Sequence, residues 1–289
     1  MTGATRPPEP HLSVVVPTFN RPDLLAECLA RLAPGVQTLA PARYDVRVTD
    51  DGTDERSRRL VSERYSWARW SAGPRRGPAS NRNAGARLAL GEWLVFIDDD
   101  CLPDAGWLAA IEAATRESCD VAEGRTVCRA GLRTPLVHAP INERGGYWWS
   151  CNLEVRRSLF EQLGGFDERF TVPHMEDVEF RERARVTGAR ERFVPDAVVD
   201  HPPRRVRWGA ATGDEHAAEV LFAVLHHRPL RLWRLMFEVS RVRLRNIFQR
   251  QVGTESASAI ASWLVELFSM LFSWNRWWRE AEALSVQRR

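Results

Sequence analysis

The feature that most constrains this chain is a short apolar run that stops at three adjacent acidic residues. Residues 93–97 have the length and composition of a buried strand. Three carboxylates follow at once, on Asp98, Asp99 and Asp100. Neighbouring carboxylates repel one another and are costly to bury without a cation, and oxygen ligands suit Mg²⁺ or Mn²⁺ better than zinc or copper. The sequence therefore predicts a metal site here, with a solvated turn as the alternative.

The same succession of strand, polar turn and helix recurs through the first half of the chain. Strands are predicted at residues 12–16, 44–49 and 93–97, each followed by helical spacing; the expected helices begin at Asp23 and Pro103 or cover residues 55–66 and 79–90. Short connections between alternating strands and helices predict a parallel, doubly wound sheet. Because ligands bind beyond the carboxyl ends of such strands, we expect the polar turns to outline one crevice.

Later segments continue the pattern less regularly. Further strands are expected at residues 119–127, 150–155, 192–194 and 197–199, with helices at 157–163 and 175–187. A glycine pair at residues 145–146 precedes Tyr147, Trp148 and Trp149. Core packing is the first interpretation of these aromatic residues, and a tryptophan that stacks against a sugar is the alternative.

Composition excludes several classes of protein. The 289 residues carry a net charge of only +3, which does not indicate a nucleic-acid binder. Neither a G-x-x-x-x-G-K-[ST] loop nor a G-x-G-x-x-G turn occurs in the first half, so kinase-like and dinucleotide-binding interpretations lose their main signal. Five cysteines without a C-x-x-C pair fit reduced cytoplasmic thiols. Residues 1–11 lack the apolar core of a signal peptide and are expected to form a disordered leader. Every fixed cation is an arginine, which is typical of a G+C-rich bacterial genome.

An ordered set of motifs points to one family. They are SVVVPTFNR at 13–21, VTDDGTD at 48–54, NRNAGARLALGEWLVFIDDD at 81–100, CNLEVRRSLFEQLGGFDERF at 151–170, MEDVEF at 175–180, and the late His201. This set resembles the family 2 glycosyltransferases and covers about residues 12–205. The resemblance implies the GT-A fold, an α/β, Rossmann-like and mostly parallel doubly wound sheet. We expect this domain at residues 12–207 and a helical extension at residues 208–289.

The resemblance also implies contacts with a nucleotide. Asp50, with Asp51 beside it, matches the contact to the base, although a turn aspartate is the alternative. The remaining matches are Pro17, Thr18 and Phe19 under the base and ribose, Arg82 near the nucleotide, and Asp98 and Asp99 toward the ribose or the waters of the metal. A surface cation paired with a nearby glutamate is the alternative for Arg82.

The catalytic and metal-binding residues follow from the same motifs. Asp100 matches the main ligand of Mn²⁺ or Mg²⁺, completed by His201 and by Asp98. Asp177 matches the catalytic base; its alternative is a helix-start carboxylate that interacts favourably with the helix dipole. A structural role is the alternative for His201. Contact with the acceptor is assigned to Trp148, Trp149 and Glu176.

Taken as a member of that family, the chain is expected to be a metal-dependent inverting hexosyltransferase of class EC 2.4. It would move a sugar from a nucleotide-diphosphate donor, with UDP as the default, to a hydroxyl of a glycan, a lipid-linked or a small-molecule acceptor, as in polysaccharide biosynthesis. One alternative is a nucleotidyltransferase, which normally carries a glycine-rich loop that residues 17–22 lack. Another is a nucleotide-sugar-binding protein without transfer activity.

The C-terminal extension has an amphipathic pattern. Basic residues share one helical face, with aromatic residues roughly opposite; they are Arg231, Arg234, Arg241 and Arg245 against Trp233, Phe237 and Phe248. Residues 257–273 form an apolar stripe, too short and interrupted by Glu266 to predict a membrane span. Packing or a homodimer contact through residues 229–289 is the first interpretation. Peripheral contact with the inner face of the cytoplasmic membrane is the second.

Overall fold

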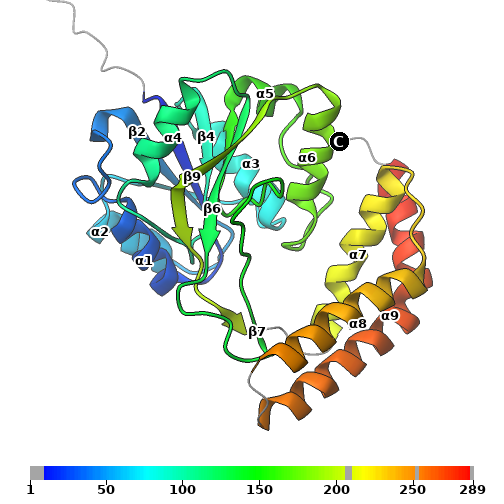
Figure 1. Ribbon diagram of the computed structural model, residues 1–289. Coiled ribbons are helices and arrows are strands. Elements are labelled where there is room, and N and C mark those ends of the chain that lie inside the picture. Colours follow the sequence, from blue (N-terminus) through cyan, green and yellow to red (C-terminus); the bar gives the residue numbers. More distant parts are fainter. Residues whose placement is uncertain (1–9, 206–209, 251–253, 287–289) are drawn as a thin grey trace, which may run out of the picture. The chain divides into compact units, whose positions relative to one another are not determined.

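The computed structural model describes residues 10–205, 210–250 and 254–286 (Figure 1). Within these residues the chain divides into two compact units. We name them the sheet unit, made of Met1–Val127, Ile141–Thr171 and Glu176–His201, and the helical unit, made of Cys128–Pro140, Val172–Met175 and Pro202–Arg289. Residue 207, the predicted end of the first domain, and residues 1–9 of the predicted leader lie outside the described residues, so those boundaries stay predictions.

An eight-stranded sheet with the order β3-β2-β1-β4-β8-β6-β9-β5 forms the centre of the sheet unit. The strands are β1 (Leu12–Thr18), β2 (Tyr44–Asp50), β3 (Arg69–Ala72), β4 (Trp93–Phe96), β5 (Leu102–Pro103), β6 (Val121–Val127), β8 (Leu153–Arg156) and β9 (Glu191–Asp200). β1 pairs in parallel with β2 and β4, and β2 with β3. β8 is antiparallel to both of its neighbours, whereas β6 and β9 are parallel. The sheet is therefore mixed but mostly parallel, as the sequence predicts.

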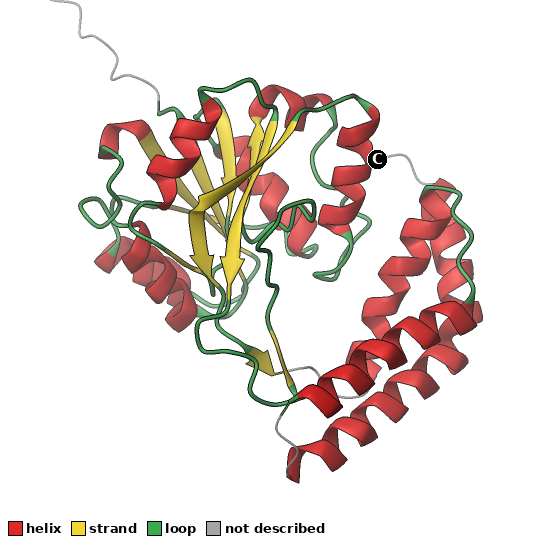
Figure 2. Ribbon diagram, in the orientation of Figure 1, coloured by secondary structure: helices red, strands yellow, loops and turns green. Residues whose placement is uncertain are grey.

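Helices cover both faces of this sheet (Figure 2). One apolar cluster joins the sheet to α1 (Pro22–Leu32), α2 (Arg56–Arg64) and α4 (Trp107–Thr115), and a second joins it to α3 (Pro78–Leu88), α5 (Arg157–Gln162) and α6 (Glu176–Val186). A short 3₁₀ turn, η1 (Pro41–Arg43), precedes β2. Side chains alternate between the faces along a strand, so Val14 belongs to the first cluster and Val15 to the second. The predicted double winding is confirmed.

The fourth helix begins later than the sequence predicts. Pro103 does not open a helix, because Leu102 and Pro103 form β5 and pair with Asp200 and Val199 of β9. The helix starts four residues later at Trp107, which is fully buried. β5 therefore ties the segment after the acidic triplet to the end of β9.

The helical unit contains α7 (Ala210–Leu225), α8 (Leu232–Gln249), α9 (Thr254–Val286) and a small antiparallel pair of β7 (Val137–His138) and β10 (Arg204–Arg205). α9 packs against both α7 and α8. A small buried cluster packs Leu136, the residue before β7, against Ile247 of α8 and Ala259 of α9. The 33-residue α9 is much longer than the predicted stripe, and by length and composition alone it could cross a membrane; 22% of its most apolar window is buried.

Candidate active site

The ends of three neighbouring parallel strands form the floor of the site. β1 lies between β2 and β4, so the turns after these strands meet at one edge of the sheet. The Thr18 hydroxyl donates a 2.6 Å hydrogen bond to Asp99. Asn81 donates from its side-chain nitrogen to the carbonyls of Thr18 at 3.2 Å and Thr49 at 3.0 Å. Asn81 therefore holds the ends of β1 and β2 together. The sequence analysis gave Asn81 no role in the site, because it predicted only that this residue lies in a helix.

Close packing of α3 on β1 places the next residue of the site. A Cβ added at Gly85 would lie 2.5 Å from Cγ1 of Val15, closer than packed carbon atoms come. Glycine at this position therefore allows α3 to lie directly on the sheet. Arg82, one turn earlier on α3, is thereby held beside the acidic triplet and is 3% exposed.

Arg82 joins two carboxylates that lie far apart in the sequence. Its guanidinium is 2.6 Å from Oδ1 of Asp98 and 2.9 Å from Oε1 of Glu176, and Glu176 is also 3% exposed. Burial opposes the charge of Arg82, but Asp98, Glu176 and then Asp177 raise its pKa. Burial and the charge of Asp177 raise the pKa of Glu176 to about 7. Arg82 is thus a buried bridge and not the surface cation of the alternative, and Glu176, proposed for the acceptor, is its partner.

A second arginine neutralises the rest of the triplet. Arg21 lies 2.5 Å from Oδ1 of Asp99 and 3.2 Å from Oδ2 of Asp100. Burial raises the pKa of Asp99 to about 7 in spite of Arg21. The sequence analysis gave Arg21 no role, although it stands within the matched PTFNR stretch. Protein arginines therefore supply part of the positive charge that the three carboxylates require.

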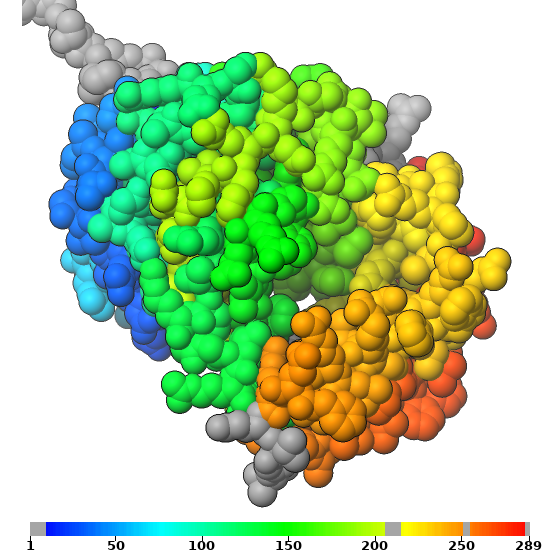
Figure 3. Space-filling view, viewed as in Figure 1, coloured from blue at the N-terminus to red at the C-terminus, as the bar shows by residue number. Residues whose placement is uncertain are grey.

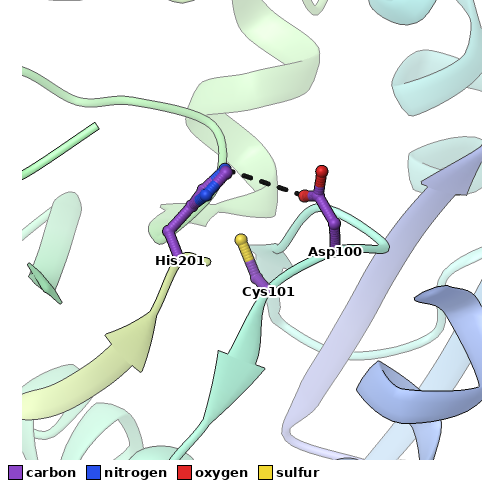
Figure 4. A group of neighbouring side chains, drawn as sticks. All are labelled: Asp100, Cys101 and His201. Atoms are coloured by element: carbon purple, nitrogen blue, oxygen red, sulfur yellow. Dashed lines mark ion pairs between the residues drawn. The ribbon is translucent and has the colours of Figure 1, made fainter. Parts of the chain in front are cut away.

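Asp100 also faces His201 from the end of β9 (Figure 4). Oδ1 of Asp100 and Nε2 of His201 are 3.7 Å apart, longer than a hydrogen bond, and both residues are buried. Cys101 lies with them in a group whose ligand atoms are all within 4.8 Å of one another. Burial raises the pKa of the Cys101 thiol well above its ordinary value. A soft sulfur ligand also suits Mg²⁺ or Mn²⁺ poorly. One oxygen and one imidazole nitrogen fit a divalent cation; Asp98, bound to Arg82, is not in this group.

Asp50 at the end of β2 and Asp51 in the turn that follows it accept different backbone hydrogen bonds. Asp51 accepts backbone hydrogen bonds from Arg75 at 2.9 Å and Gly77 at 3.1 Å, which fixes the loop before α3. Asp50 accepts one from Gly52 at 2.7 Å. Of the residues expected under the base and ribose, Phe19 is 57% exposed at this edge, and Pro17 and Thr18 are buried in β1.

Asp177 lies in the first turn of α6. Its Oδ1 accepts a 2.7 Å hydrogen bond from the Val178 amide, and Oδ2 accepts a weaker one from the Ser150 amide at 3.4 Å. The side chain is half-buried, beside the fully enclosed Glu176. A helix N-terminus favours a carboxylate, and the two hydrogen bonds orient Asp177 with part of its surface accessible. A general base needs these properties.

The aromatic segment, residues 145–149, is held by the buried carboxylate of Glu123 in β6. Glu123 accepts backbone hydrogen bonds from Tyr147 at 3.1 Å and Trp148 at 2.9 Å, and another from Gly146. Trp148 has no exposed surface and donates its indole N–H to Glu191 at 2.8 Å, so the structure favours packing for this residue. Trp149 is half-buried and stacks on the 45% exposed Tyr147, with ring centroids 4.4 Å apart. Tyr147, which the sequence analysis did not select, presents the most accessible ring.

The chain is 30% identical over 236 residues to validoxylamine A glucosyltransferase of Streptomyces hygroscopicus subsp. limoneus; the match covers 65% of this chain and 50% of that relative, so it spans half of the relative's length. Two solved structures share the fold. TarS 1–349 of S. aureus in complex with UDP-GlcNAc has a TM-score of 0.57, 18% identity, and coverage of 95% of this chain and 90% of that chain.

The second structure is mannosyltransferase PcManGT from Pyrobaculum calidifontis in complex with GDP-Man and Mn²⁺, with a TM-score of 0.52, 20% identity, and coverage of 98% of this chain and 77% of that chain. The model of "Glycosyl transferase family 2" matches residues 13–176, more than half of the chain. The predicted family and GT-A fold are confirmed. The chain belongs to glycosyl transferase family 2.

Proposed function

We propose that the chain is a metal-dependent, inverting glycosyltransferase that uses a nucleoside-diphosphate sugar. This proposal rests on two clusters of charged residues, each of which contains one aspartate of the acidic triplet. Asp98 joins Arg82 near Asp177, and Asp100 faces His201. The turn of the acidic triplet therefore lies next to a candidate base and also supplies one residue of a cation-binding pair. This arrangement suits a reaction that removes a proton at one point and releases a diphosphate at another.

Asp177 is the general base of this proposal. Its carboxylate takes the proton of the acceptor hydroxyl while that oxygen forms a bond to the anomeric carbon. The bond from that carbon to the diphosphate oxygen breaks at the same time, and the nucleoside diphosphate leaves with the electron pair. One displacement from the opposite face inverts the configuration. Asp100 and His201 would hold the divalent cation, which when bound offsets the negative charge of the leaving group.

Donor and acceptor follow from the strand ends and the aromatic segment. Asp50, Thr18 and Phe19 lie at the edge of the sheet where a nucleoside would bind, and UDP is our expected donor nucleotide. The exposed ring of Tyr147, supported by Trp149, offers a surface for an acceptor sugar. The acceptor class we propose is a hydroxyl of a glycan, free or linked to a lipid.

Incubation with candidate donors, Mn²⁺ and acceptors tests this function. We expect release of nucleoside diphosphate that depends on the acceptor. A nucleotidyltransferase would instead release pyrophosphate from a nucleoside triphosphate and a sugar phosphate, and a binding protein would release neither. Donor binding to UDP-, GDP- and dTDP-sugars, measured by the rise in unfolding temperature, selects the donor for the assay.

Removal of the metal is expected to abolish turnover. Asp100→Asn should lower kcat by about 100-fold or more, because the diphosphate charge is no longer offset at this position. His201→Ala should act in the same direction, and Asp54→Asn, at an exposed turn of the same unit, is the control. Activity is measured against Mn²⁺ concentration, with EDTA and with metal added back. Full turnover of the native enzyme in EDTA would refute the metal role.

The helical unit presents an apolar face that needs a partner. Its members are at least 40% exposed, and they are Trp233, Phe237 and Phe248 of α8 and Ile260, Leu264, Val265, Phe268, Leu271 and Phe272 of α9. Soluble monomers rarely expose so many large apolar side chains on two adjacent helices. Figure 3 shows the outer surface of α8, drawn in yellow to orange. The exposed Arg234, Arg241 and Arg245 on α8 give this unit a positive border, so we propose contact with an anionic membrane on its cytoplasmic side.

Vesicle flotation tests the membrane contact. The double variant Phe268→Ser/Phe272→Ser should reduce binding to vesicles containing anionic lipid by about tenfold or more, because each phenylalanine contributes more than 1.4 kcal/mol when buried. Val186→Ser, which changes an exposed valine of the sheet unit, is the control. A wild-type protein that fails to float and instead forms a dimer that the double variant disrupts would identify a second copy as the partner.

A further inference from the structure

Arg181 of α6 binds the backbone of the aromatic segment. Its Nη1 atom donates hydrogen bonds to the carbonyl oxygens of Gly146 at 2.9 Å and Tyr147 at 3.3 Å. The Arg181 side chain is 18% exposed, so most of its surface is enclosed by the protein. All three residues belong to the sheet unit. Arg181 therefore ties α6 to the residue that presents the most accessible ring of the segment.

The same face of α6 carries the proposed base. Asp177 precedes Arg181 by four residues, which places the two side chains on one face of the helix, one turn apart. Asp177 accepts its 3.4 Å hydrogen bond from the amide of Ser150, the residue that follows the aromatic segment. One turn after Arg181, the Arg185 guanidinium lies over the buried Trp148 ring, 5.7 Å from its centroid. Three successive turns of α6 thus contact the segment or its next residue.

The backbone of the aromatic segment requires such support. Trp148 has a φ of +60°, a left-handed conformation that is uncommon for a large side chain. A residue keeps such a conformation when its surroundings fix it. Glu123 binds the amides of residues 146–148, and Arg181 binds the carbonyls of residues 146 and 147. Tyr147 is therefore held at both of its backbone polar groups, and its ring stays outside these contacts.

We propose that Arg181 is a positioning residue for the acceptor and acts through Tyr147. It holds the Tyr147 carbonyl to the helix that bears Asp177, and so fixes the exposed ring relative to the base. An acceptor sugar that stacks on this ring would then present its hydroxyl to the Asp177 carboxylate. This inference rests on the glycosyl transfer and the acceptor role of Tyr147 proposed above. It adds that one helix both carries the base and fixes the ring that binds the acceptor.

Steady-state kinetics of three variants test this role. In Arg181→Met, kcat/KM for the acceptor should fall about tenfold, because a small misplacement of a bound group is costly, while KM for the donor stays within about twofold. Both hydrogen bonds come from one nitrogen, so Arg181→Lys should keep most of the wild-type kcat/KM. The matched control is Arg183→Met, since Arg183 of the same helix donates to the carbonyls of Leu163 and Gly165, both at 2.7 Å. This control should lower the unfolding temperature and retain kcat/KM for the acceptor.

Equal losses of kcat/KM in Arg181→Met and Arg183→Met, each matched by lost stability, would show a structural role alone. A double-mutant cycle shows in addition whether Arg181 acts through Tyr147. Arg181→Met should cost about tenfold in the wild type and less than about twofold in a Tyr147→Ala background, because the ring to be positioned is then absent. The same cost in both backgrounds, or a wild-type kcat/KM in Tyr147→Ala, would overturn the proposal.

Hydrogen exchange provides a readout that does not need activity. In Arg181→Met, the backbone amides of residues 146–150 should exchange faster than in the wild type, with those of β1 and β2 unchanged. Unchanged protection at residues 146–150 would overturn the proposal. If the native protein shows no transfer with any donor, the proposed function fails, and the exchange result alone decides whether Arg181 fixes the aromatic segment.

Discussion

Replacement of Asp177 by asparagine is expected to lower kcat by about 1,000-fold while donor affinity and stability stay at wild-type values. Asparagine has nearly the same shape, and its one oxygen can still accept the shorter hydrogen bond, from the Val178 amide at 2.7 Å. The weaker contact with the Ser150 amide at 3.4 Å is lost. Asparagine cannot take a proton from the acceptor hydroxyl. The change therefore removes the proposed base and leaves the start of α6 in place.

Rates with saturating donor and acceptor, and donor binding by calorimetry, measure the two effects of Asp177→Asn separately. The matched control is Glu182→Gln, which neutralises another carboxylate of α6 that pairs with Arg181. This control should keep kcat within about twofold, as expected of a surface ion pair. A transfer rate near that of the wild type in Asp177→Asn would mean that another group is the base.

Replacement of Arg82 by methionine should destabilise the protein by about 3–5 kcal/mol, because it leaves the buried Glu176 and the half-buried Asp98 without their shared cation. The fully enclosed guanidinium makes both contacts from a single side chain. Activity should fall as well, since both Asp98 and the start of α6 lose their anchor. Unfolding in denaturant and the rate of transfer measure the two consequences.

A double-mutant cycle separates the ion pair from simple packing at Arg82. Glu176→Gln removes one of the two carboxylates that contact Arg82, so Arg82→Met should cost less stability in that background than in the wild type. Arg87→Met, at the exposed end of α3, is the control and should change stability by less than about 1 kcal/mol. Equal costs of Arg82→Met in the two backgrounds would show that Glu176 contributes nothing to the bridge.

The strands that are marked by a local pattern of apolar and polar residues could be predicted from the sequence. β1, β2 and β4 are apolar or alternating runs that stop at polar turns, and this pattern identifies both the strands and the sheet edge. The pairing between strands that lie far apart in the sequence could not be predicted from such local patterns. The expected strands at 192–194 and 197–199 are one strand, β9, whose residues 195–197 have no partner in β6.

The sequence predicts the negative charges of the candidate site and, through the family motifs, one of the two arginines that contact the triplet, Arg82. The acidic triplet shows that cations are needed, and Asp100 with His201 follows from the family motifs. With 41 cationic residues in the chain, pattern alone does not show that Arg21 and Arg82 are the two that reach the triplet. Trp148 illustrates the same limit, because its neighbour Glu191 is 43 residues away.

The backbone of the aromatic segment takes its shape from Glu123, whose carboxylate binds consecutive amides of the loop. The outward-facing ring of Tyr147 takes no part in those bonds. Evolution or an engineer could thus exchange that ring for another side chain without remodelling the loop beneath it. Under the acceptor role proposed for Tyr147, a single substitution at this position would change acceptor preference and leave the backbone of the loop in place.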